Sequence, residues 1–66
     1  MVIKNNIREL RKQKNLSQKG LSESLNVSRQ TVISIENGKY DPSLKLSMRI
    51  AQFFDRKVED IFVLEE

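Results

Sequence analysis

Leu16–Gly38 reads LSQKGLSESLNVSRQTVISIENG and contains two short helix patterns joined by a turn. Ser17 and Ser28 each precede an amphipathic run, and serine is a good N-cap because its oxygen accepts a hydrogen bond from a free first-turn amide. Apolar residues follow each serine three or four positions apart, which places each pair on one helical face. These residues are Leu21, Leu25, Val32 and Ile35. The pattern predicts a helix-turn-helix over about residues 17–37.

Three residues favour a tight turn between the two helices. Asn26 stands between them, and asparagine tolerates the left-handed conformation that such turns commonly need. Val27 is expected to point back under the turn, and Ser22 is small where the two helices approach each other. Spacing alone leaves an ordinary pair of antiparallel helices, with serines acting only as caps, as an open interpretation.

The second helix is expected to expose Arg29, Gln30, Ile33 and Ser34 on one face, since residues four apart are neighbours. The arginine fork fits guanine O6 and N7, and the Gln30 amide fits adenine N6 and N7. Ile33 can contact a thymine methyl group, and Ser34 can reach a base or a phosphate. The helix N-terminus at Ser28 favours a phosphate. Open alternatives are a phosphate contact for Arg29 and a simply exposed side chain for Ile33.

The composition describes a small chain without covalent staples. It has 66 residues and no cysteine or histidine, which excludes a disulfide, a thiolate metal site and a histidine-based active site. No apolar run approaches the ~20 residues that span a membrane, and no signal-peptide pattern is present. We expect one domain over residues 1–66, cytoplasmic and associated with the nucleoid, that holds no cofactor or metal. So small a core favours self-association.

Charge is distributed unevenly along the chain. Residues 1–40 carry eight basic and three acidic side chains, whereas residues 41–66 carry four basic and six acidic ones. The basic part contains the predicted helix-turn-helix, so the asymmetry favours a polyanionic partner bound from one side.

Three further helices are expected outside the central segment. The first runs over about residues 6–14 with Asn5 or Asn6 as its cap, another begins at Ser43 after Pro42, and a short one covers about residues 58–61. The fourth helix in the chain is expected to bury Leu44, Met48, Ala51 and Phe54, with Leu46, Ile50 and Phe53 broadening the face. The β-prone ends, residues 1–3 and 62–64, suggest a small two-stranded ribbon.

Taken together, these residues resemble the helix-turn-helix of the Cro and phage-repressor family, also called the xenobiotic-response-element type. The resemblance covers about residues 5–62. It depends on Leu16–Gln18, Leu21, Leu25, Val27–Val32, Ile35–Lys39, Pro42–Leu44 and Ile50–Ala51. It implies an all-α, compact five-helix lambda-repressor-like domain, and the short stand-alone repressors of bacteria and phage are the most similar members. The chain departs from the family at Gly20, Ser22 and Asn26, where an acidic residue, alanine and often glycine are usual.

The resemblance also implies roles for individual residues. Family members commonly read bases from the position that Gln30 occupies. They also bind the DNA backbone through a glutamine at the start of the second helix, which corresponds to Gln18. Family members often bind phosphate just after the recognition helix, at the positions of Asn37 and Lys39, although a merely solvated lysine is an open alternative. Tyr40, an amphipathic ring with a hydroxyl donor, is expected to lie near the backbone as well.

Contacts within and between protein chains are implied too. In relatives, a first-helix arginine pairs with the glutamate that ends the third helix, which corresponds to Arg11 and Glu36. Relatives often dimerise through the C-terminal region, where Val58, Phe62 and Leu64 are the candidate interface residues. An open alternative is that these residues, Phe62 in particular, close the core of the monomer.

These observations predict a sequence-specific regulator that binds double-stranded DNA, a repressor acting as a homodimer on a two-fold symmetric operator. An alternative is a protein-interaction module such as an antitoxin. An enzyme is a remote third, because the carboxylates are scattered and no nucleophile constellation appears. Any signal response would come from a second regulatory protein or from dilution of the dimer.

Overall fold

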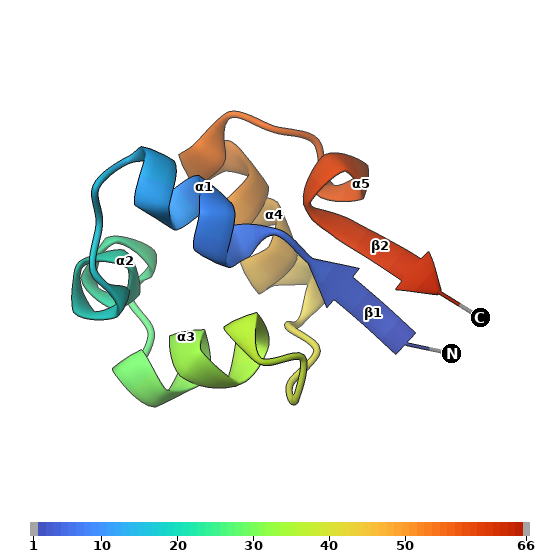
Figure 1. Cartoon of the computed structure of the whole chain (residues 1–66), viewed down its shortest axis with the longest axis horizontal. Coiled ribbons are helices and arrows are strands. Elements are labelled where there is room, and N and C mark those ends of the chain that lie inside the picture. Colours follow the sequence, from blue (N-terminus) through green and yellow to red (C-terminus); the bar gives the residue numbers. More distant parts are fainter. Residues whose placement is uncertain (1, 66) are drawn as a thin grey trace.

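The computed structural model describes residues 2–65, which form five helices and one two-stranded antiparallel sheet (Figure 1). The elements in chain order are β1 (Val2–Asn5), α1 (Ile7–Gln13), α2 (Gln18–Leu25), α3 (Arg29–Glu36), α4 (Leu44–Phe54), α5 (Val58–Ile61) and β2 (Phe62–Glu65). The helical fold class and the terminal ribbon predicted from the sequence are both confirmed. Within this range, no helix combines the length and the apolar composition that crossing a membrane requires.

Serine residues cap the N-termini of three helices. Ser17 accepts a hydrogen bond from the amide of Gly20, and Ser28 accepts one from the amide of Thr31. Ser43 caps α4 in the same way, through the amide of Leu46. Each cap satisfies one of the free amides that every helix N-terminus carries, so the predicted serine caps are confirmed.

Left-handed residues end two of the helices. Asn26, with φ of 57°, closes α2, and Asp55, with φ of 55°, closes α4. Both adopt the αL conformation that commonly terminates helices. The left-handed turn expected at Asn26 is therefore present, and it directs the chain from α2 into α3.

The start of α1 differs slightly from the expectation of residues 6–14. Asn6 occupies the N-cap position but its side chain makes no capping bond. Asn5 does so instead, because its Oδ1 accepts a hydrogen bond from the amide of Ile7 at 3.1 Å. The Asn6 side chain donates to the carbonyl of Asp60 at 3.2 Å, which ties the start of α1 to α5.

One core lies between the helices. Its buried apolar members are Ile7, Leu10, Leu21, Leu25, Val32, Ile35, Leu46, Ile50, Ala51, Phe54 and Ile61. The prediction for Leu44 and Met48 is wrong, because they are 75% and 52% exposed. The apolar pattern of α4 contains two overlapping stripes, and the core packs on the one that runs through Leu46, Ile50 and Phe54.

The terminal ribbon brings the two ends of the described chain together (Figure 1, right). β1 pairs with β2 in a register that places Ile3 opposite Leu64 and Lys4 opposite Val63. The predicted pairing of the β-prone ends is confirmed for these strands, and Met1, which the prediction included, lies outside the described residues. Lys4 also forms an exposed ion pair with Glu65 at 3.2 Å.

Replacing Leu21 with alanine should lower the free energy of unfolding by about 2–5 kcal/mol, because this side chain is fully buried and its loss leaves a cavity. Urea denaturation monitored by circular dichroism measures the change. Leu44→Ala, the same substitution at a 75% exposed position, is the matched control and should stay within about 0.5 kcal/mol of the parent. Equal losses in both variants would contradict this description of the core.

Candidate nucleic-acid interface

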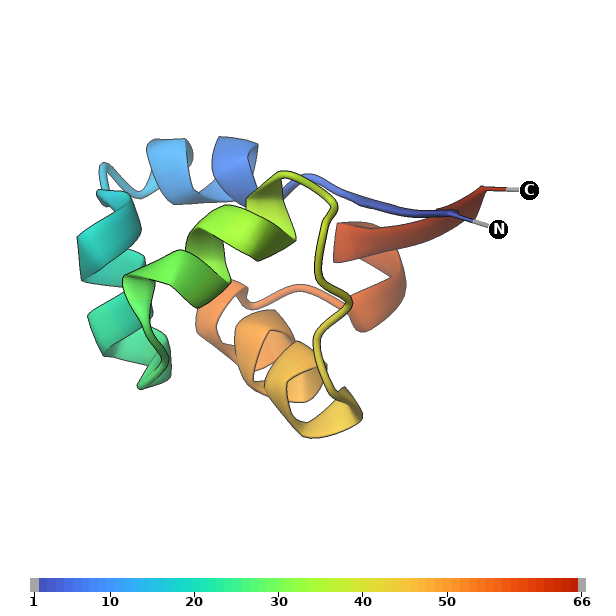
Figure 2. The same cartoon turned by 90° about the horizontal axis from the view of Figure 1, so that it is seen from below.

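Helix α3 lies at one side of the molecule, with its outer face uncovered by other elements (Figure 2). On its inner face, Val32 and Ile35 are each 2% exposed. On its outer face, Arg29 and Gln30 are exposed, and Ile33 and Ser34 are half-buried. The helix therefore presents to solvent the face that carries the four residues predicted to contact bases. The buried residues anchor that face to the core.

The outer face of α3 and the segment after it enclose a shallow hollow of about 260 Å³. The hollow is lined by Ser28, Gln30, Thr31, Ser34, Lys39 and Tyr40. Five residues that sequence reasoning assigned separately to base or phosphate contacts thus meet around one surface. Arg29 and Ile33 are not among the residues that line it. Hydroxyl, amide and ammonium groups around one concave surface suit a polar, negatively charged ligand.

The N-terminus of α3 is well ordered by its cap. The Ser28 hydroxyl accepts from the amide of Thr31 at 3.1 Å and lies 2.8 Å from the Thr31 hydroxyl. The serine side chain is therefore engaged within the helix. Helix geometry leaves the first-turn amides of Arg29 and Gln30 without partners inside the helix, so these amides are the groups that face an anion at this end.

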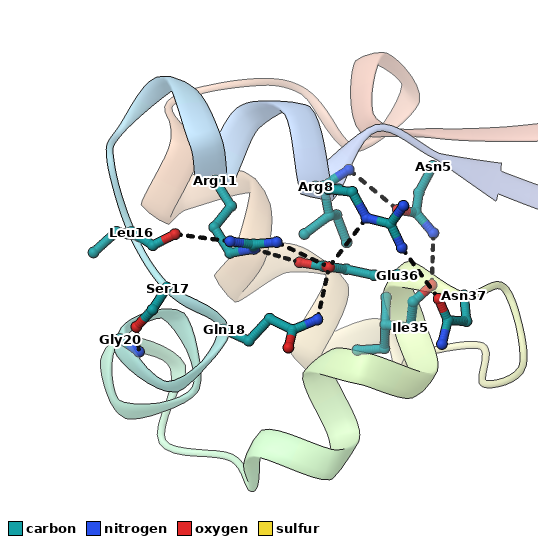
Figure 3. A network of polar contacts seen from close by, with 11 residues as sticks. Asn5, Arg8, Arg11, Leu16, Ser17, Gln18, Gly20, Ile35, Glu36 and Asn37 are labelled. Carbon is teal, nitrogen blue, oxygen red and sulfur yellow. Dashed lines mark hydrogen bonds and ion pairs between the residues drawn. The ribbon is translucent and has the colours of Figure 1, made fainter.

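A buried carboxylate fixes the other end of α3 (Figure 3). The Glu36 side chain is 0% exposed and accepts a hydrogen bond from Arg11 Nε at 2.7 Å. Arg11 Nη2 also donates to Glu36 at 3.3 Å, and Arg11 Nη1 donates to the carbonyl of Leu16 at 2.8 Å. One arginine thereby joins α1, the segment before α2 and the last residue of α3.

Gln18 and Arg8 complete this network. Gln18 Nε2 donates to Glu36 Oε1 at 3.2 Å, and Arg8 Nε lies 3.6 Å from the same oxygen. Gln18, predicted to clamp phosphate, is thus held by α3 at the start of α2. Asn37, also predicted to bind phosphate, accepts a hydrogen bond from Arg8 Nη2 at 3.2 Å.

Sequence reasoning missed the roles of Arg8 and Asn5. Arg8 lies three residues before Arg11, on the same side of α1, and this spacing was the available signal. Asn5 donates from its side chain to the carbonyl of Ile35 at 2.9 Å, which satisfies a carbonyl at the end of α3. No sequence signal connected Asn5 with a residue thirty positions away, since only the tertiary fold brings them together.

The electrostatics of Glu36 reflect this environment. Burial on its own raises the pKa of Glu36, but hydrogen bonds from Arg11 and Gln18 and the charge of Arg11 outweigh it. The pKa of Glu36 is therefore below its ordinary value of 4.5. Because the folded-state pKa is depressed, ionised Glu36 stabilises the fold at every pH above its ordinary pKa of 4.5. This contribution to stability is lost as the pH falls through the folded-state pKa.

Replacing Glu36 with glutamine should lower the free energy of unfolding by about 3 kcal/mol near neutral pH, because it leaves Arg11 without its counter-charge. From neutral pH down to about pH 4.5 the difference from the parent should stay constant. It should shrink as the pH falls further through the folded-state pKa, because the parent glutamate then protonates and comes to resemble glutamine. Urea denaturation across this pH range measures it. Glu23→Gln, at an exposed position of α2, is the control and should differ little from the parent at any pH. A difference for Glu36→Gln that does not vary with pH would contradict the assignment.

Sequence comparison places the chain among small regulators. It is 55% identical over 64 residues to an uncharacterized HTH-type transcriptional regulator of Methanocaldococcus jannaschii, and the match covers 97% of each protein. It is 48% identical over 64 residues to an uncharacterized HTH-type transcriptional regulator of Bacillus subtilis, again over 97% of each. Both relatives are thus transcriptional regulators of the helix-turn-helix type.

Solved structures and family models agree with that result. The fold is similar to the restriction-modification controller protein C.AhdI from Aeromonas hydrophila, with a TM-score of 0.73, 31% identity and coverage of 82% of each chain. The helix-turn-helix family model matches residues 7–61, which include all five helices. The chain therefore belongs to the helix-turn-helix family of the Cro and phage-repressor type, whose members are DNA-binding transcriptional regulators.

Proposed function

We propose that this protein is a sequence-specific transcriptional repressor that binds a two-fold symmetric operator as a homodimer, with α3 in the major groove. The observation that carries the proposal is the hollow on the outer face of α3. There, Gln30 and Ser34 lie beside Lys39 and Tyr40, so groups suited to base edges adjoin groups suited to phosphate. An α-helix with such a face fits the width of the major groove.

The N-terminal half of α3 supplies the base contacts. Gln30 offers a donor and an acceptor to adenine, and Arg29 beside it offers a planar fork to guanine. Ile33 and Ser34 follow one turn later on the same side of the helix, where they face a thymine methyl group and a neighbouring base. All four side chains are at least partly accessible while α3 itself is anchored by its buried residues.

Phosphate contacts flank this reading face. Lys39 and Tyr40 come from the segment after α3, and Tyr40 is 46% exposed. The first-turn amides of α3 lie at the N-terminal end of the helix, whereas Gln18 is held against Glu36 at its C-terminal end. A dimer making about 6–10 phosphate contacts should lose ~10³–10⁵ in affinity between 50 and 200 mM salt.

A second hollow supports the homodimer. It measures about 260 Å³ and is lined mainly by apolar side chains: Ile3, Pro42, Ser47, Val58, Glu59, Phe62, Val63 and Leu64. Val58 and Phe62 pack partly against the core, whereas Leu64 is 64% exposed. All three candidate interface residues thus lie on one surface. One recognition helix contacts only a few base pairs, so two copies about 34 Å apart on successive major grooves would supply the selectivity.

Replacing Gln30 with alanine should weaken binding to the preferred duplex by about 1–3 kcal/mol and relax discrimination at one base pair, because the amide contact with the base is lost. Lys39→Ala should instead weaken all duplexes by a similar factor, since phosphates carry no sequence. Fluorescence anisotropy with the preferred duplex and single-base variants measures both effects. Gln52→Ala, at an exposed position of α4, is the matched control and should bind as the parent does. Unchanged discrimination in Gln30→Ala would refute the reading helix.

Replacing Val58 with aspartate should dissociate the dimer while the helices persist, because it places a charge on the apolar hollow. Analytical ultracentrifugation at micromolar concentration, together with circular dichroism, measures both properties. Gln52→Asp introduces the same side chain at an exposed position and should leave the dimer intact. A parent protein that sediments at single-chain mass and binds operator one-to-one would overturn the homodimer and favour a protein-interaction role for this surface.

A further inference from the structure

We propose that Arg8 and Asn37 together bind one DNA phosphodiester at the C-terminal end of α3. Arg8 supplies the charge and also holds the Asn37 side chain in place. The inference rests on the proposed function, because it adds a backbone contact to the same DNA-binding face. It adds a residue of α1 to a site otherwise built from α2, α3 and the segment after α3.

The groups around Glu36 carry a net positive charge. Two guanidinium groups, those of Arg11 and Arg8, share this single carboxylate. Arg11 is the deeper partner, with a side chain 11% exposed, and its Nε lies 2.7 Å from the carboxylate. Arg8 is 47% exposed and lies farther away, at 3.6 Å. The surplus positive charge of the cluster therefore lies on Arg8, at the surface.

The Asn37 side chain has a defined orientation. Its Oδ1 accepts the hydrogen bond from Arg8 Nη2 at 3.2 Å (Figure 3). The acceptor of the carboxamide is thus turned toward Arg8, which leaves its Nδ2 donor group for another partner. An arginine and an amide donor side by side match the oxygens of a phosphodiester.

The electrostatic field at the C-terminal end of α3 also requires a cation beside any bound phosphate. The C-terminus of a helix carries partial negative charge, so a phosphate can approach the end of α3 only where cations offset it. Arg8 provides such a cation from a different helix. Asn5 reduces the repulsion further, because its side chain already satisfies the carbonyl of Ile35.

The test is the salt dependence of DNA binding by Arg8→Gln. The slope of log affinity against log salt should become shallower by about one per bound protomer, and affinity for operator and random duplexes should fall by the same factor. Arg56→Gln removes the same charge from the α4–α5 connection, which lies on the other side of the molecule from α3 (Figures 1 and 2). This control should keep the parent slope. An unchanged slope in Arg8→Gln, with or without weaker binding, would overturn the proposal.

Asn37→Ala tests the shared ligand without disturbing Glu36. Alone it should weaken binding with the slope unchanged, and combined with Arg8→Gln it should cost less than the sum of the single effects. Additive losses would show that the two residues do not bind one phosphate. If the parent protein bound DNA without salt dependence, the proposed function itself would fail. If the parent showed normal salt dependence, an unchanged slope in Arg8→Gln would refute only the proposed phosphate site of Arg8 and Asn37.

Discussion

The hydrogen-bonded ion pairs of the Glu36 carboxylate determine how α1, α2 and α3 are arranged. It is the last residue of α3, yet its partners come from α1 and from the first residue of α2. Burying a carboxylate is expensive unless it is paired and fully hydrogen-bonded, and here two arginines and one amide surround it. The network therefore favours one relative placement of the three helices, the one in which the outer face of α3 remains open.

The same end of α3 is connected to the terminal ribbon. Asn5, the last residue of β1, donates a side-chain hydrogen bond to the carbonyl of Ile35, and β1 is paired along its length with β2. The surface proposed for dimerisation includes β2. The short strand β1 therefore links that surface to the C-terminal end of α3. A small chain without disulfides can hold α3 in place in this way, through hydrogen bonds that cross the fold rather than through a large core.

Local signals made most of the fold predictable. Serine caps, an asparagine at the turn and apolar spacing act within a few residues, so they identify α2, α3 and the start of α4 directly. The buried face of α4 was only partly predictable, because several apolar stripes overlap and tertiary packing selects one, which left Leu44 and Met48 exposed. The outer face of α3 follows from periodicity. The contacts of Arg8 and Asn5 did not, since they join residues about thirty positions apart.

If α3 reads DNA sequence in a two-fold symmetric assembly, the purified protein should select particular duplexes from a random pool. The selected duplexes should share one motif with two inverted half-sites whose centres are about one helical turn, roughly 10 base pairs, apart. A pool that shows no enriched motif after selection at moderate salt would rule out this mode of binding.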